Sequence, residues 1–399
     1  MPNAQTQKNL SIAYKVETTF NTPPAVVTGA TAFRPNAGTG LELSRATINP
    51  GEIRADGKSP MGRLGSKSVA GSYPADLSVG SFDPLIEAVM RSTWVPAVTI
   101  AAASITSAKF TANTIVLTSG DAIALGVRVG DIIRVPTSVT ATNNNRNLRV
   151  TAVATTTITV AETLTVNATA DTTVTLQIAK KISQGATPVR RSFTFEEYYK
   201  DIDQSVQATG CRISSMKITG NPDGTALVEF GIVGADLIPL ATSASPFYTS
   251  PTVFGSIALV FADATIRLNG ADVATPTAFE LTLDMQAKGQ PGLYMVTPDV
   301  FEGNSVLTGS VSLIRSDLSN LTEFTSETEF ELHLLLVEPE SEPKDFISIF
   351  VPRIKLTKVS GNYGGDGAYV EALPFITGTK GAGVSGYDDS MLTILTSAA

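Results

Sequence analysis

Two stretches of this chain follow the same residue pattern. Gly220 begins GNPDGTALVEFGIVG, and Gly361 begins GNYGGDGAYVEALPFITG. The segments before them, RISSMKITGN and RIKLTKVSGN, match when Arg212 is laid on Arg353. Each copy has the pattern of a strand, a glycine-containing turn and a second strand. The chain is therefore expected to contain one fold unit twice.

The repeat extends upstream of the hairpins. SKSVAGSYPADLS resembles NSVLTGSVSLIRS when Gly71 is paired with Gly309, and each segment leads into a helix candidate. The first helix is predicted over residues 83–94, with Asp83 as N-cap and Pro84 at the first helical position. The second is SDLSNLTEF, with Ser316 as its cap. FTFEEYYKDID is predicted to be a short helix or an irregular edge.

The two copies differ by one long insertion. The surplus in the first copy falls at about residues 96–185, which carry their own strands and turns and almost no large aromatic residues. We expect a small inserted β domain there. The predicted domains are then 1–95 and 186–245, the two parts of the first repeat, 96–185, the insert, and 246–399, the second repeat.

The remaining composition is typical of an all-β protein with few helices. Thr, Val, Ser, Ala and Gly are abundant and turn signals recur at short intervals. Alternation is clear in FELHLLLVE, where Phe330, Leu332, Leu334 and Leu336 share one face. His333 lies on the other face and is expected to be exposed or partnered.

Charge and cysteine content limit the functional classes. The formal net charge of -8 argues against a protein that grips nucleic acid, because binding phosphates requires a basic face. The one cysteine, Cys211, excludes an intrachain disulfide and is expected to be a buried structural thiol. We see neither a signal-peptide pattern at the N-terminus nor an apolar run of membrane-spanning length, so we expect a soluble protein folded in a reducing cytoplasm.

Several segments in their order resemble the tail tube proteins, or major tail proteins, of tailed bacteriophages. These are YKVETTFNTPP, SVAGSYPADLS running into an Asp-Pro helix, the closing hairpin after RISSMKITG, and VRVGDIIRV followed by NNRNLRVTAV in the insert. The resemblance implies two tandem β-sandwich or barrel domains, each flanked by a helix. It also implies a structural virion protein whose rings stack into a tube, the channel for genome passage into the host.

The resemblance implies that the main partner is the chain itself. If single-domain relatives close a ring of six, a two-domain chain closes a pseudo-sixfold ring with three subunits. Other tail proteins are expected at the tube ends, and DNA is expected to pass through the lumen without specific binding. The expected location is the virion tail, after assembly in the host bacterial cytoplasm and without membrane insertion. An insert on the outside of the tube would obstruct a contractile sheath, which favours the long non-contractile tail type.

Two charged segments are candidates for assembly or for the lumen. An acid-rich stretch can be a solvated outer face or part of a channel wall that repels DNA phosphate, and both interpretations stay open. Its candidate residues are Glu327, Glu329, Glu331 and Glu338. GEIRADGKSPMGRLGSK is expected to be a long extended loop, too rich in glycine for a regular strand, that stacks on an acidic surface of the next ring. Its candidate residues are Arg54, Lys58, Arg63 and Lys67.

We expect no enzyme activity, cofactor or metal. GAGVSG, from Gly381, fits the dinucleotide fingerprint in its letters but not in its context, because no βαβ unit precedes it. With one His and one Cys far apart in sequence, neither a zinc site nor a Cys/His pair is attractive. The alternative to a tail tube is a secreted or surface β-sandwich protein used in adhesion or binding, and electron microscopy of the purified protein would separate the two.

Overall fold

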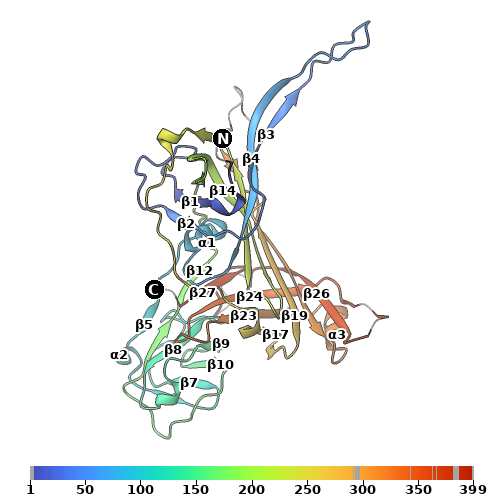
Figure 1. The fold of residues 1–399 in the computed structure, drawn as a ribbon. Coiled ribbons are helices and arrows are strands. Elements are labelled where there is room, and N and C mark those ends of the chain that lie inside the picture. Colours follow the sequence, from blue (N-terminus) through green and yellow to red (C-terminus); the bar gives the residue numbers. More distant parts are fainter. Residues whose placement is uncertain are drawn as a thin grey trace.

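The structure is a computed structural model that describes residues 4–290, 292, 297–341, 343–361, 363–364, 366–380 and 386–397. Figure 1 shows a body of long strands, a smaller sheet at the lower left, and one hairpin that extends far beyond the rest of the chain. Strands dominate and helices are few, so the all-β prediction is confirmed. The GAGVSG motif lies outside the described residues, except for Gly386.

The first repeat is built from strands that pair in a simple order. Their neighbours run β3–β4–β15–β14–β13–β1–β2, all antiparallel, and β16 pairs with the first half of β14. The bounds are β1 Leu10–Val16, β2 Thr31–Phe33, β3 Gly40–Ile48, β4 Arg63–Asp76, β13 Phe193–Tyr199, β14 Gln204–Gly220, β15 Leu227–Gly234 and β16 Asp236–Leu240.

The second repeat has the same order of pairing. Its neighbours run β19–β22–β26–β24–β23–β17–β18, and β27 pairs with the first half of β24 as β16 does with β14. The short β25 pairs with β26. The bounds are β17 Thr265–Leu268, β18 Ala271–Asp272, β19 Pro276–Asp284, β22 Val306–Ile314, β23 Phe330–Val337, β24 Phe346–Leu356, β25 Ser360–Gly361, β26 Val370–Thr377 and β27 Thr393–Thr396.

The glycines that align in the sequence occupy equivalent places in the two sheets. Gly71 on β4 pairs with Leu41, and Gly309 on β22 pairs with Leu281. At each, a Cβ would collide with a backbone carbonyl of the neighbouring strand, that of Gly40 in one repeat and that of Glu280 in the other. Glycine is therefore required at both positions by close strand approach.

Among the described residues, a seven-stranded sheet shares no strand pairing with the sheets of this body and has the order β5-β11-β8-β9-β10-β7-β6. It encloses a separate apolar core that includes Phe110, Ile133 and Leu176. The sheet ends at Ile178, before the expected insert boundary at 185, and β12 (Lys180–Ser183) instead pairs with β27 of the body. The bounds are β5 Val98–Ile100, β6 Ala108–Phe110, β7 Thr114–Leu117, β8 Ile132–Thr137, β9 Leu148–Val153, β10 Thr157–Val160 and β11 Thr175–Ile178.

The body has one continuous apolar core rather than one per repeat. Buried side chains from both repeats, such as Phe230 and Phe279, belong to the same cluster. The repeats are joined through β14, whose second half pairs with β15 on one side and with β19 on the other. The result is an eight-stranded sheet, β3–β4–β15–β14–β19–β22–β26–β24, with four strands from each repeat.

The first helix is shorter than the sequence predicts. α1 spans Asp83–Met90, so Asp83 is its first residue and not its N-cap, which is Phe82. The Asp83 carboxylate accepts a hydrogen bond from Lys180 Nζ at 2.7 Å. The helix ends where Arg91 takes a left-handed conformation, with φ of 49°.

The second helix and one strand also depart from the predictions. α3 spans Ser319–Thr325, and its N-cap is Leu318 and not Ser316. The Asp317 carboxylate, one residue earlier, accepts the Ser319 N–H at 2.8 Å. FTFEEYYKDID was predicted as a helix or irregular edge, but Phe193–Tyr199 is the central strand β13, because alternate aromatic residues there are buried.

The remaining elements are short. A two-stranded ribbon of β20 and β21 lies in the β19–β22 connection. The bounds are β20 Lys288–Gly289, β21 Val300–Phe301, α2 Ala102–Ile105, and the 3-10 turns η1 Gln7–Asn9, η2 Ala141–Asn143, η3 Thr242–Ala244 and η4 Phe261–Asp263. Within the described residues, none of the helices is long and apolar enough to cross a bilayer.

Candidate assembly surfaces

The eight-stranded sheet has one apolar face and one polar face. On β14 and β19, Met216, Ile218 and Leu283 are buried in the core, while the residues between them are exposed or half-buried. The strict alternation follows from the period of two along each strand. The polar face is therefore a broad surface that runs across both repeats.

Carboxylates outnumber cations on this polar face. The strand carboxylates are those of Glu42, Glu229, Glu280 and Asp284, and the strand cations are those of Lys217, Arg353 and Lys355. Lys217 Nζ lies 3.1 Å from Glu280 Oε1. Arg353 and Lys355 pair with Glu329 and Glu327, so the three cations are all ion-paired and the surface is polar without an excess of cations.

The four acidic candidates from the sequence do not form one cluster. Glu329 binds the Arg353 guanidinium at 2.7 Å, which lowers the pKa of its carboxyl, and Glu327 binds Lys355 at 3.1 Å. Glu331 is partly buried beside Tyr387, and burial raises the pKa of its carboxyl. Glu338 lies at the far end of β23. Two of the four thus join the edge of the polar face.

The β3–β4 hairpin forms the arm that projects in Figure 1. The connection at residues 49–62 carries Arg54 and Lys58, but β4 begins at Arg63, so the last five residues of the expected loop are in a regular strand. Lys67, at the base of the arm, is bound to Asp236 at 2.7 Å. Three of the four predicted cations therefore lie on the outer part of the arm and the fourth belongs to the body.

The arm also exposes large apolar side chains. Ile53 and Met61 are essentially fully exposed, and Ile48 and Leu64 are more than half exposed. The candidates predicted from the sequence of this segment were its cations, and these apolar residues were not among them. Apolar side chains gathered on a projecting hairpin are unusual for an isolated chain and mark it as a contact surface.

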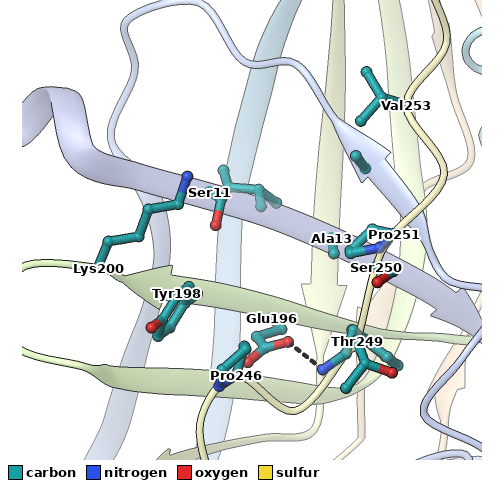
Figure 2. Close-up of a pocket in the computed structure, with 13 residues that line it drawn as sticks. Ser11, Ala13, Glu196, Tyr198, Lys200, Pro246, Thr249, Ser250, Pro251 and Val253 are labelled. Atoms are coloured by element: carbon teal, nitrogen blue, oxygen red, sulfur yellow. Dashed lines mark hydrogen bonds between the residues drawn. The ribbon is translucent and has the colours of Figure 1, made fainter.

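The linker between the repeats, residues 246–253, lines a pocket of about 460 Å³ together with residues of β1, β2 and β13 (Figure 2). Glu196 is buried there, and its carboxylate accepts the backbone N–H groups of Phe247 and Tyr248 at 2.6 and 2.8 Å. Thr252 continues the attachment by bonding with Ala30. Both carboxylate oxygens of Glu196 thus hold the linker in place, and the pocket is interpreted as part of this structural attachment.

Cys211 and His333 have side chains that could take part in catalysis or metal binding, but both have structural roles here. Cys211 is fully buried, as predicted, and burial raises the pKa of its thiol well above the usual value. His333 is buried, bonds to Ser348 Oγ at 2.7 Å, and has its pKa lowered to about 3 by burial and by the nearby Arg149 and Arg267. Among the described residues, His, Cys, Asp and Glu do not gather into a group able to hold a metal.

The sheet has two open edges that were not predicted from the sequence. In the described part of the chain, the outer edge of β3 has no strand partner, and β24 lacks one on its outer side beyond Ile354. The polar face, the arm and these two edges describe a class of protein: a repeated β fold whose sheet ends in unpaired edges to which a further strand could pair. The repeat in the sequence could have indicated these edges, because they are the places where a third copy of the repeat would attach.

A comparison with family models identifies the chain within that class. Residues 7–377 match the phage tail tube protein family, and the chain therefore belongs to it. The protein is accordingly a structural component of the bacteriophage virion, located in the tail. A search of curated proteins found no match. The family supports a structural rather than an enzymatic role and gives no support to the adhesion alternative.

Proposed function

We propose that this chain forms the wall of the tail tube by closing rings of three subunits and stacking them. The observation that carries the proposal is the eight-stranded sheet with four strands from each repeat and an open edge at each end. Two copies of one unit already lie side by side in one chain, so three chains would supply six units. The division into first tube domain (1–95 and 186–245), insert (96–185) and second tube domain (246–399) belongs to this proposal.

The ring would be a closed β-barrel. Three chains with eight strands each give about 24 strands, beyond the 16–18 that already leave an aqueous channel in other barrels. With strands about 4.8 Å apart and a tilt of about 40°, opposite backbones are on the order of 45–50 Å apart. Such a channel is wider than a DNA duplex. Closure also removes exposed sheet edges, which otherwise recruit strands without control.

The polar face would line this channel. Its ion pairs and excess of carboxylates suit a wall along which DNA slides, because cations at each phosphate would have to be released in turn. The genome would then pass without specific binding. In the proposed tube, Glu327 and Glu329 lie at the rim of the wall rather than on the outer surface.

The arm would connect one ring to the next, and other tail proteins would cap the tube ends. Its exposed apolar residues and its cations at Arg54, Lys58 and Arg63 fit a contact that buries apolar area and is guided by charge. The insert packs beside β23 and on the first half of β24, away from the charged second half of that strand. This favours an insert outside the tube, and with it a long non-contractile tail. Assembly would take place in the host cytoplasm.

The test is a reconstruction of assembled tubes without imposed symmetry. Three chains and six similar barrels per ring, with the arm between rings, are the expected result. Six chains per ring would overturn the threefold ring, and a wall dominated by Lys and Arg would overturn the assignment of the polar face. Purified protein that forms neither rings nor tubes under any condition tested would count against self-assembly itself.

A further inference from the structure

The junction between the two repeats offers a template for the junction between chains. Within the chain, β14 and β19 form six antiparallel pairs, from Ser215 opposite Asp284 to Gly220 opposite Phe279. We call these pairs the internal seam. Lys217 and Glu280 are joined across it at 3.1 Å on the polar face. This inference rests on the proposed ring and concerns the residues that close it.

The counterparts of both seam strands have open edges. β3 corresponds to β19, because Leu41 and Leu281 pair with the equivalent glycines Gly71 and Gly309. β24 corresponds to β14, because Arg353 and the residues after it align with Arg212 and its successors. The chain therefore carries the two halves of a second seam at opposite ends of its eight-stranded sheet, where they cannot meet within one subunit.

Exposure of one apolar side chain supports this correspondence. Leu283 on β19 is 1% exposed, because β14 lies beside it in the internal seam. Its counterpart on β3 is Leu43, two residues after the buried Leu41 and on the same face, yet Leu43 is 38% exposed. The difference is expected if Leu43 is covered by a strand that the single chain does not supply.

We infer that residues 356–361 of one chain pair antiparallel with residues 39–44 of the next, with Lys358 beside Glu42 of that chain. With Arg353 aligned on Arg212 and Gly309 on Gly71, transfer of the internal register puts these two opposite each other. Both are exposed and, within the described residues, neither has an ion-pair partner. Their opposite charges meet on the polar face, as those of Lys217 and Glu280 do.

The contact between these two residues does not depend on a single register. Through the equivalent glycines, Leu356 opposite Phe375 takes the place of Ile213 opposite Ile232, two residues on from the sequence alignment, so a seam displaced by two residues is the main alternative. That displacement keeps every side chain on its own face and puts Lys358 diagonally across from Glu42. The internal ion pair has this diagonal geometry, since Lys217 is directly opposite Thr282 and binds Glu280.

A cysteine pair tests the seam directly. Chains that carry both Glu42→Cys and Lys358→Cys are assembled, oxidised with oxidised glutathione, and separated on a denaturing gel without reductant. Directly opposite strand positions are within the Cα separation that a disulfide spans, and diagonal positions are at or beyond its limit. We expect disulfide-linked dimers and trimers on the gel and no larger species. The native Cys211 is fully buried and does not compete.

The matched control moves one cysteine away from the edge. Glu229→Cys with Lys358→Cys keeps the same chemistry on the same face, but Glu229 lies on β15, inside the sheet. This control should stay monomeric on the gel. Linkage as strong in the control as in the seam pair would mean random collision and would overturn the inference.

Charge reversal gives an independent measurement. Glu42→Lys or Lys358→Glu alone should lower the fraction of protein in rings, and the two together should restore it. Glu229→Lys, with the same charge change inside the sheet, should leave ring formation near the unmodified level. Tubes that form normally from each variant, with no linkage of the cysteine pair, would overturn the seam and leave the proposed function intact. Unmodified protein that never forms rings would instead contradict the proposed function.

Discussion

At the residue scale, the sequence predicts on which face of its strand His333 lies, but not that this face is buried. The alternation in FELHLLLVE placed it on the face opposite the leucines, and it is partnered there, by Ser348. It is also buried, because Ile132 of the insert and Leu335 pack together on that face. A contact between segments some 200 residues apart leaves no local signal in the sequence.

Burial of His333 predicts a pH dependence of stability. Its folded pKa of about 3 lies below the usual 6.5, so under pH 6.5 the unfolded chain binds one more proton than the folded chain. Stability is then lost as pH falls from about 6.5 toward 3, by about 1.4 kcal/mol per pH unit. His333→Gln should remove this contribution, so that acidification from pH 7.5 to 5.0 costs the unmodified chain about 2 kcal/mol more than the variant.

Urea unfolding of unassembled protein at the two pH values measures this difference. Ser348→Ala serves as the control, because it removes the hydrogen bond but leaves the titrating imidazole in place. Equal pH sensitivity of the unmodified chain and His333→Gln would show that the imidazole titrates in the fold with its ordinary pKa, and would contradict the prediction.

At the element scale, the arm shows that amino-acid composition alone does not predict where a strand ends and a loop begins. Its glycines suggested a loop, yet the pairing of β3 with β4 extends to Ile48 opposite Arg63. Ladder hydrogen bonds between two adjacent segments hold a strand even where its sequence has low β propensity. The segment RLGSK is therefore part of a strand, although its ladder with β3 shifts register once, opposite residues 65 and 66.

Removal of the tip of the arm should separate ring formation from stacking. Since Ile48 and Arg63 are paired, residues 49–62 can be replaced by Asn-Gly, which favours a two-residue hairpin turn. We expect a stability change within about 0.5 kcal/mol, because the tip is exposed, and rings without long tubes. Negative-stain microscopy and sedimentation check the result, with a length-matched Gly/Ser tip as the control. Tubes of normal length would contradict a stacking role.

At the scale of the whole molecule, the insert is more than an appendage on a loop. Arg149 reaches from it to the carboxylate of Asp272 with two bonds of 3.0 and 2.9 Å, and Gly130 lies against the ring of Phe350. An apolar cluster of Ile132, Leu335, Phe346 and Leu395 seals the junction. Although it is inserted in the first repeat, it is docked on the second.

Replacement of the insert should therefore have two separable effects. Val98 and Ile178 are paired, so a short Gly/Ser linker can join the ends after removal of the residues between them. The uncovered cluster should make this protein aggregate. Adding Leu335→Thr and Leu395→Thr should restore solubility, and the resulting chains should form tubes visible by negative stain. A soluble, folded product that forms no tubes would favour a brace between rings over an external position.

The sequence by itself determined the all-β class, the repeated unit and the family. Period-two alternation, glycines at close strand approaches and the order of strands and hairpins are local or repeated patterns, which survive in one dimension. The start and end of α1, and the fact that residues 193–199 form a strand, were not predicted from the sequence. Helix caps and the burial of aromatic residues depend on neighbouring elements. The candidate cations and carboxylates were chosen because their segments are rich in charge. Charge content alone does not show which of them lie on the arm, on the sheet or at the insert junction.

The tertiary structure alone decided which edges of the sheet stay open and which face is polar. Strand pairing between β14 and β19 links residues about 65 positions apart, and the insert junction links residues more than 100 apart. Side chains recognise such partners through burial and complementary shape, and many sequences satisfy the same contact. For this reason the internal seam, and the second seam inferred from it, could be read only from the folded chain.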